Sequence, residues 1–257
     1  MDNTNQKFCF ATLALGKKYR EMTKTLAEDL KKYSSGTMLV VGTDNPKDLL
    51  SFDNVIPFKL SQQGILHCYH DKRFVILKAL SEFDTVIQID ADTYMTDFIS
   101  PKLDFSRGII EGFNENLVNH VTKYTPERLD RLKKIATKID VDISQANFVG
   151  ESLFIVSKDN GKEIEFIEQW GKIGLYLELK GIHAGSGNII GLAALKVGFK
   201  TSRTPSWEQI KNVTNHFDAS QKIKRSSFDN LKRRVQYHYR LNKNRLQALS
   251  DFDFFYR

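Results

Sequence analysis

The N-terminal third of the chain alternates between apolar runs and stretches with helical spacing. An apolar run over residues 8–15 ends at Gly16 and predicts a buried strand. The following apolar residues recur at intervals of three and four, at Tyr19, Met22, Leu26, Leu30 and Tyr33. This spacing, with charged residues between, predicts a helix that ends at residues 34–36, Ser-Ser-Gly.

The same alternation continues along the chain. Residues 37–43 predict a second strand, and residues 55–58 a short third strand that its proline places at a sheet edge. Residues 72–81 predict a helix that Asp71 can cap, and residues 84–90 predict another strand. Strands and helices in this order predict an α/β domain with a mostly parallel sheet.

The second half of the chain is more polar at first. Residues 100–144 are charged and predict an insertion over the sheet edge, with a helix over 127–138. Beyond it the pattern predicts a strand over 148–156, a helix from Asp159, a glycine-rich loop over 181–187 and a helix over 188–196. Helical spacing returns near the end, at Phe228, Leu231 and Val235. We expect one α/β domain followed by a helical tail.

Composition agrees with a packed, cytoplasmic protein. The 257 residues are 41% hydrophobic, which suffices for a core, and no stretch reads as a leader or a membrane span. Cys9 and Cys68 lack metal-ligand spacing and predict buried thiols in a reducing compartment. Between His216 and Arg257, ten Lys and Arg face four Asp, which accounts for six of the seven net positive charges. The basic character therefore belongs to the tail.

Two carboxylates follow the strand over 84–90. Asp90 and Asp92 stand at its C-terminal end, where open α/β sheets bind ligands. Such close carboxylates repel each other unless they share a cation, and Mg²⁺ or Mn²⁺ carrying a phosphate meets that need. Two other Asp-x-Asp pairs, at 140–142 and 251–253, lack the preceding apolar run. Asp90 and Asp92 are thus the candidate metal ligands.

A second signal comes late in the chain. A single histidine is most often a surface or core residue, but His216 lies six residues before Lys222. A neutral imidazole can be a third protein ligand to the metal, and a lysine can meet the phosphate that the metal holds.

Four segments in this order resemble the retaining glycosyltransferases of the GT-A fold, most closely the family 8 group of galactosyltransferases and glycogenin. The segments are Phe10-Ala11-Thr12-Leu13, His70-Asp71-Lys72-Arg73-Phe74, Gln88-Ile89-Asp90-Ala91-Asp92 and His216-Phe217-Asp218-Ala219-Ser220-Gln221-Lys222. The resemblance implies a GT-A-like nucleotide-sugar-binding fold over residues 1–222. Residues 223–257 would form a basic, aromatic helical extension.

The resemblance also implies roles for individual residues. Asp90, Asp92 and His216 would hold Mn²⁺ or Mg²⁺. The residues implied to bind the nucleotide-sugar donor are Ala11 and Thr12 at the nucleoside, Lys72 or Arg73 at the diphosphate or sugar, Ala91 beside the metal and Lys222 at the diphosphate. The activity implied is transfer of a hexose from a UDP-sugar to a glycan or glycolipid hydroxyl, with retention.

The sugar side of the site departs from the family pattern. Ala219 replaces a glycine, and the Asp-Gln pair expected beside the sugar is replaced by residues 186–188, Ser-Gly-Asn. Candidate catalytic residues are therefore Ser186, Asn188 and Glu151, which could stabilise the anomeric centre or bind the acceptor. A strand-edge carboxylate facing water is the alternative for Glu151.

The basic, aromatic tail allows three interpretations. It suits an anionic membrane surface, a nucleic acid or simply a solvated helix face. We favour the membrane surface, at the inner face of the membrane, with a lipid-linked or glycan acceptor.

Two other functions stay open at this point. Asp90 and Asp92 also resemble the first motif of haloacid-dehalogenase-type phosphatases, with Asp90 as nucleophile. That motif normally follows the first strand of the core, and the late acidic pair of those enzymes is missing. A non-catalytic binder is the third possibility.

Overall fold

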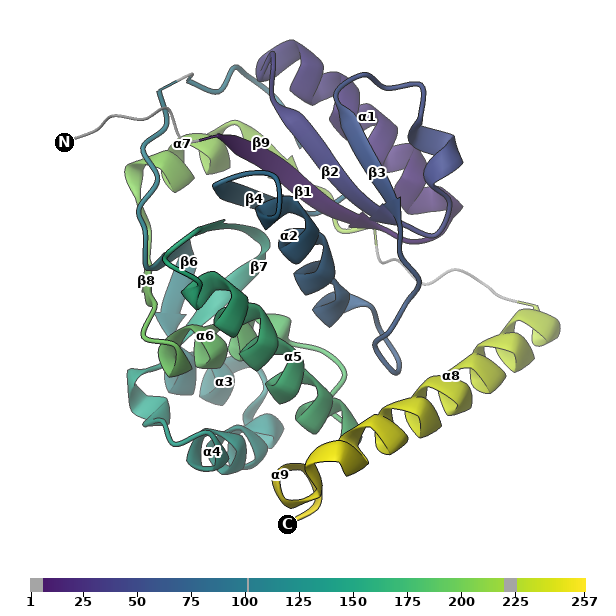
Figure 1. Cartoon of the computed structure of the whole chain (residues 1–257), viewed down its shortest axis with the longest axis vertical. Coiled ribbons are helices and arrows are strands. Elements are labelled where there is room, and N and C mark those ends of the chain that lie inside the picture. The colour runs from purple at the N-terminus through teal and green to yellow at the C-terminus, as the bar shows by residue number, and fades with distance from the viewer. Residues whose placement is uncertain (1–6, 101, 220–225) are drawn as a thin grey trace.

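The computed structural model describes residues 7–100, 102–219 and 226–257 and places them around one seven-stranded sheet (Figure 1). The strands in spatial order are β3 (Val55–Lys59), β2 (Met38–Thr43), β1 (Phe8–Ala14), β4 (Thr85–Ile89), β7 (Asn147–Ser157), β6 (Ile109–Asn116) and β8 (Lys200–Ser202). Within this sheet β7 alone runs against the others, because its pairings with β4 and β6 are antiparallel. The predicted mostly parallel sheet is confirmed.

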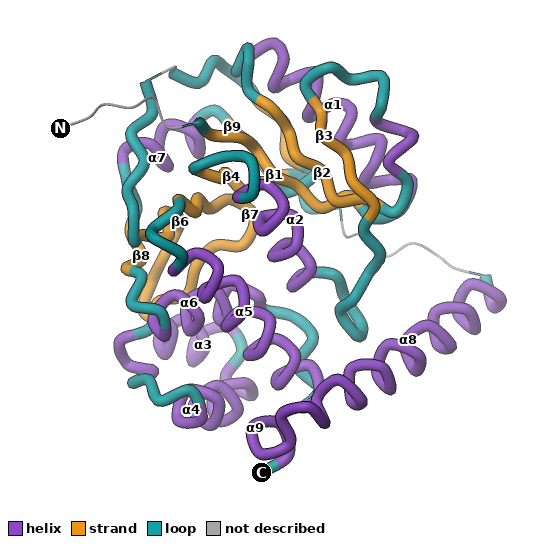
Figure 2. The backbone as a smooth tube through the Cα atoms, viewed as in Figure 1, coloured by secondary structure: helices purple, strands orange, loops and turns teal. Residues whose placement is uncertain are grey.

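Helices cover both faces of this sheet (Figure 2). The described helices are α1 (Lys17–Tyr33), α2 (Lys72–Leu80), α3 (Leu117–Tyr124), α4 (Leu129–Lys138), α5 (Lys162–Leu179), α6 (Ser186–Lys196), α7 (Pro205–Asn212), α8 (Ser227–Ala248) and α9 (Phe252–Tyr256). Of these, α8 packs against α5 and lies outside the layers on the sheet. One core lies between the sheet and α1 with α7, and the other between the sheet and α2, α5 and α6. Alternate residues of β1 supply both cores, with Cys9 on one face and Phe10 on the other.

The topology creates a switch point between β1 and β4. After β1 the chain moves outward to β2 and β3, then returns through α2 to β4 on the other side of β1. Connections that diverge from two neighbouring parallel strands leave a crevice at their C-terminal ends. Asp90 and Asp92 immediately follow β4 at this edge.

The region from 100 to 144 corrects the sequence prediction. It contains β6, which lies inside the sheet between β7 and β8 and is no insertion over its edge. The sequence pattern did not predict this strand because several of its residues are polar. One of them, Glu111, is fully buried. That carboxylate accepts hydrogen bonds from the Ser106 amide, at 2.8 Å, and from the Thr204 hydroxyl. A buried carboxylate with such partners is tolerated in a core.

Other boundaries differ less. The helix expected at 188–196 begins two residues earlier, at Ser186. Asp71 precedes α2, but its carboxylate does not cap that helix and accepts the amides of Gln63 and Gly64 instead. No helix among the described residues combines the length and apolar character needed to cross a bilayer.

Candidate functional site

The predicted metal ligands meet at the edge where β4 ends. One ligand atom from each of Asp90, Asp92 and His216 lies within 4.8 Å of the others. The His216 Nε2 atom is 3.2 Å from Asp92 Oδ1 and 3.6 Å from Asp90 Oδ2. Two carboxylate oxygens and an imidazole nitrogen suit a divalent ion of the Mn²⁺ or Mg²⁺ kind. The donor set fits such an ion.

A short ladder explains why a histidine so late in the sequence arrives here. Strand β5 (Thr93–Met95) follows Asp92 directly and pairs antiparallel with β9 (Thr214–His216). In this register Thr93 faces His216. Asp92 itself ties the next segment, because its carboxylate accepts the Ala219 amide at 2.9 Å. The two parts of the site are therefore one structural unit.

Lys72 joins this cluster from the first turn of α2. Its Nζ lies 2.5 Å from Asp90 Oδ1 and donates to the carbonyl of Glu151 at 3.0 Å. Burial lowers the pKa of Lys72, but the charges of Asp90 and Glu151 outweigh burial and the net shift is upward. Lys72 therefore stays protonated inside the site.

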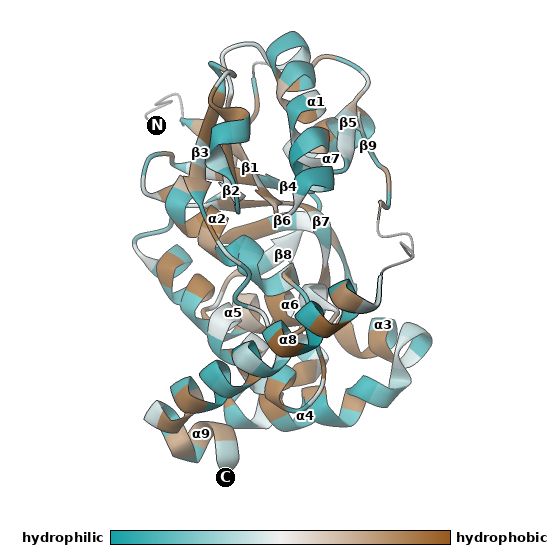
Figure 3. Ribbon diagram, turned by 90° about the vertical axis from the view of Figure 1, so that its right-hand side faces the viewer, coloured by the Kyte–Doolittle hydropathy of each residue, from teal (hydrophilic) through white to brown (hydrophobic). Residues whose placement is uncertain are grey.

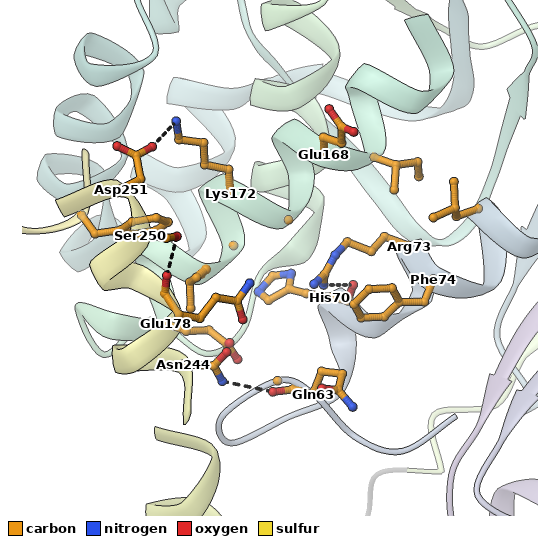
Figure 4. Close-up of a pocket in the computed structure, with 18 residues that line it drawn as sticks. Gln63, His70, Arg73, Phe74, Glu168, Lys172, Glu178, Asn244, Ser250 and Asp251 are labelled. Atoms are coloured by element: carbon orange, nitrogen blue, oxygen red, sulfur yellow. Dashed lines mark hydrogen bonds and ion pairs between the residues drawn. The ribbon is translucent and has the colours of Figure 1, made fainter. Parts of the chain in front are cut away.

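Arg73 lies in another part of the molecule. Its guanidinium donates to the carbonyl of His70 at 2.8 Å and stacks on the Phe74 ring. Figure 4 shows it beside His70 in a cavity of about 430 Å³ between α2, α5 and the C-terminal helices. The residues that line this cavity include none of the predicted metal ligands. Of the two adjacent cations, Lys72 alone reaches Asp90.

A group of buried polar atoms belongs to the three residues predicted to lie beside the sugar. Within the described chain, Glu151 Oε2, Ser186 Oγ and Asn188 Oδ1 have no hydrogen-bond partner. Burial raises the pKa of Glu151, whereas Lys72 and the backbone N–H of Ser186 lower it less strongly. Buried polar atoms are normally paired, so these three atoms leave hydrogen-bonding capacity that a bound water or a polar ligand can use.

Other predicted residues are also buried. Ala11 and Thr12 are fully buried in β1, and the Thr12 hydroxyl has no hydrogen-bond partner among the described residues. Ala91 is 3% exposed in the turn between the two aspartates. Lys222, the predicted diphosphate ligand, lies outside the described residues.

The structure adds residues that the sequence reasoning missed. Tyr19, assigned to a helix core, is close enough to Asp92, Tyr69 and Asp218 for their charges to reinforce the effect of burial, which raises the pKa of Tyr19. Lys18, its neighbour on α1, donates to the carbonyl of Ala219 at 2.6 Å. The lysine and tyrosine at the start of α1 thus adjoin the crevice. No spacing rule links them to Asp90.

Comparisons with known proteins bear on the fold. No protein-family model matches the sequence, and no curated protein matches it. Among solved structures, the chain is similar to the galactosyltransferase LgtC, which was crystallised in complex with donor and acceptor sugar analogs. The similarity covers 91% of this chain and 95% of that chain, with a TM-score of 0.56 and 9% sequence identity. The chain therefore has the GT-A-like α/β fold that its sequence predicts.

Proposed function

We propose that the protein is a metal-dependent glycosyltransferase that moves a hexose from a nucleotide-sugar, a UDP-sugar by family resemblance, to a glycan or glycolipid hydroxyl. The observation that carries this proposal is the meeting of Asp90, Asp92 and His216 at the β1/β4 switch point. A GT-A-like fold, shared with a galactosyltransferase, supports it. A divalent ion bound there would neutralise charge on the departing diphosphate.

Each residue of the candidate site would then have its own role. Asp90, Asp92 and His216 hold the cation, and Lys72 places a fixed positive charge beside it. Lys222 is proposed to meet the diphosphate. Glu151, Ser186 and Asn188 present unpartnered polar atoms where the sugar would lie. Glu151 would stabilise the anomeric centre or bind the acceptor, and retention is proposed from the family resemblance.

The exposed half of α8 supports a membrane surface as a further partner. Residues 226–236 are all exposed, and four large side chains recur along one face, at Phe228, Leu231, Val235 and Tyr239. Lys232, Arg233 and Arg234 lie among them, and Figure 3 shows apolar and polar segments alternating along this helix. An apolar stripe with flanking cations suits anionic lipid. We assign residues 223–257 to this extension and residues 1–222 to the catalytic domain.

Donor hydrolysis tests the proposal without knowledge of the acceptor. A panel of nucleotide-sugars is incubated with the protein and Mn²⁺, and release of the nucleotide is measured. We expect slow hydrolysis of a UDP-hexose that EDTA abolishes. Absence of hydrolysis and of any UDP-dependent rise in Tm would contradict the proposal and favour a non-catalytic binder. Capture of a phosphorylated Asp90 would favour a phosphatase instead.

A further inference from the structure

A second cavity, of about 460 Å³, lies beside the start of α6 and includes no predicted metal ligand. Three loops and the start of α4 form its walls. The lining residues are Leu66, His67, Glu127, Arg128, Arg131, Lys180, Gly181, Ile182, His183 and Ala184. Six of these ten side chains are ionisable, so the chemistry of this cavity is set by charge.

The charges in this cavity are mostly positive. Arg128, Arg131 and Lys180 share it with a single carboxylate, Glu127. That carboxylate is 68% exposed and lies 3.5 Å from Arg128 Nε, so solvent weakens its effect. Arg131 donates to the carbonyl of Lys180, and no described carboxylate lies within 4.0 Å of Arg131 or Lys180. Two cations therefore lack an acidic partner in the part of the chain that is described.

Helix α8 adds to this positive charge. The ring of Tyr237 on α8 lies 6.3 Å from that of His183. Burial lowers the pKa of His67, which also lines the cavity; the charges of His183 and Arg233 lower this pKa further, whereas that of Glu178 raises it. Arg233 of α8 is thus close enough to act on a residue that lines the cavity.

Arg128 connects this cavity to the sugar side of the candidate site. It donates to the carbonyl of Ala184 at 3.2 Å. A Cβ atom added to Gly185 would lie 2.6 Å from Arg128 Nη1 and 3.1 Å from Asn188 Nδ2. The charge of Arg128 also lowers the pKa of Glu151, against the larger effect of burial. The guanidinium thus stands between the cavity and Glu151 and Asn188, two of the three polar residues that we propose to lie beside the sugar.

We propose that this cavity binds an oxyanion carried by the acceptor, so that the acceptor is a phosphorylated or carboxylated glycan. This inference rests on the proposed function, because that function places an acceptor next to Glu151 and Asn188. Guanidinium groups bind phosphate and carboxylate through paired hydrogen bonds, and the ammonium of Lys180 adds a mobile charge. A neutral glycan would leave Arg131 and Lys180 without an acidic partner.

Calorimetric binding of three probes tests this inference. Glucose, glucose 6-phosphate and glucuronate are titrated into the metal-free protein without donor. We expect glucose 6-phosphate, glucuronate or both to bind at least about tenfold more tightly than glucose. Comparison of these two probes shows whether the site prefers a phosphate or a carboxylate. The preference should disappear in a double variant, Arg131→Gln with Lys180→Gln, and weaken at high salt.

A matched control uses two exposed lysines of α4 that do not line the cavity, Lys133 and Lys134. Their double change to glutamine removes the same charge and should keep the preference. Circular dichroism and Tm verify that both double variants fold.

Two results would overturn the inference. These are equal binding of all three probes by the wild type, and a preference that survives in Arg131→Gln with Lys180→Gln. A separate titration with UDP and Mn²⁺ tests the proposed function. If the wild type does not bind UDP but prefers the two anionic probes, the proposed transferase function is refuted and the oxyanion site remains. If the wild type binds UDP but shows no preference for the anionic probes, only the oxyanion site is refuted.

Discussion

At the scale of single residues, the ion pair between Lys72 and Asp90 has the clearest energetic consequence. Lys72 is 8% exposed and Asp90 is 20% exposed, so neither charge is well solvated. Removing one partner of a buried pair costs about 3–5 kcal/mol, because the other charge stays behind. A bound cation could replace the lost charge. The stability of this pair is therefore linked to the candidate metal site.

Substitution of Lys72 by methionine tests that link. We expect Lys72→Met to lower the free energy of unfolding by about 3 kcal/mol in metal-free protein, as measured by urea unfolding. Mn²⁺ should raise Tm more in this variant than in the wild type. The control Lys31→Met removes an exposed ion pair with Asp53 and should cost at most about 1 kcal/mol. Equal effects of the two substitutions would contradict the account.

His70 gives a pH-dependent prediction. Burial, reinforced by nearby cations, lowers the pKa of His70 from 6.5 to about 3. Between these values the unfolded chain binds more protons than the folded one, so this histidine makes stability fall as pH falls. His70→Gln keeps an acceptor for the Trp170 indole and removes the titration. The wild type should therefore lose stability relative to the variant by up to about 1.4 kcal/mol per pH unit.

Urea unfolding of both proteins at several values between pH 7 and 4 measures this difference. Burial raises the pKa of the neighbouring Asp71 to about 6, which has the opposite effect on stability. Asp71 is present in both proteins, so its contribution largely cancels in the comparison. Parallel curves for wild type and variant would show that His70 is not buried in its neutral form.

At the scale of elements, those with a clear apolar pattern were predictable, and those held by tertiary contacts were not. Strand β1 and helix α1 have clear periodicities, because each buries one continuous apolar face. Strands β5 and β9 have three residues each and exist only because they pair with one another. Strand β6 can hold the buried carboxylate of Glu111 because Ser106 and Thr204 donate hydrogen bonds to it. Such contacts join distant residues and leave no local pattern.

The candidate site shows the same division. Asp90 and Asp92 follow an apolar run, and a motif linked them to His216. Arg128 has no such signal, because a loop and the start of α6 bring it beside Asn188. Residues that reach a site through packing alone need the fold before they can be named.

Helix α8 carries a prediction of its own. Its C-terminal end is held to the body by Ala248, which is fully buried, while Leu231 and Val235 are about 60% exposed. We expect Leu231→Ser with Val235→Ser to reduce binding to anionic vesicles at least about tenfold in a flotation assay, because lipid burial of each side chain contributes about 1.5–3 kcal/mol. Leu50→Ser, which changes a leucine 69% exposed elsewhere, is the control. Unchanged vesicle binding by the double variant would refute the membrane role.

This pair of substitutions is a sharper test than removal of the whole tail. Ala248 and Phe255 belong to the main core, and the Asn244 side chain donates to the carbonyl of Gln63. A truncation after residue 223 would expose these contacts and lower stability for reasons unrelated to lipid.

At the scale of the whole molecule, opposite charges gather at two places. The β1/β4 switch point carries the three candidate metal ligands, and the cavity beside the start of α6 is lined by three cations. The projecting half of α8 extends from the same body (Figure 1). We propose that the first place meets the donor and the second the acceptor, with the membrane-facing segment of α8 beside the second.

The central claim is that Asp90, Asp92 and His216 hold a divalent cation together with a diphosphate. Electron paramagnetic resonance of free Mn²⁺ measures its binding directly, with and without UDP. We predict one Mn²⁺ per chain, bound at least about tenfold more tightly when UDP is present, and no such site in a folded Asp92→Asn variant. The claim would be contradicted if UDP does not change the affinity for Mn²⁺, or if Asp92→Asn and the wild type bind Mn²⁺ equally well.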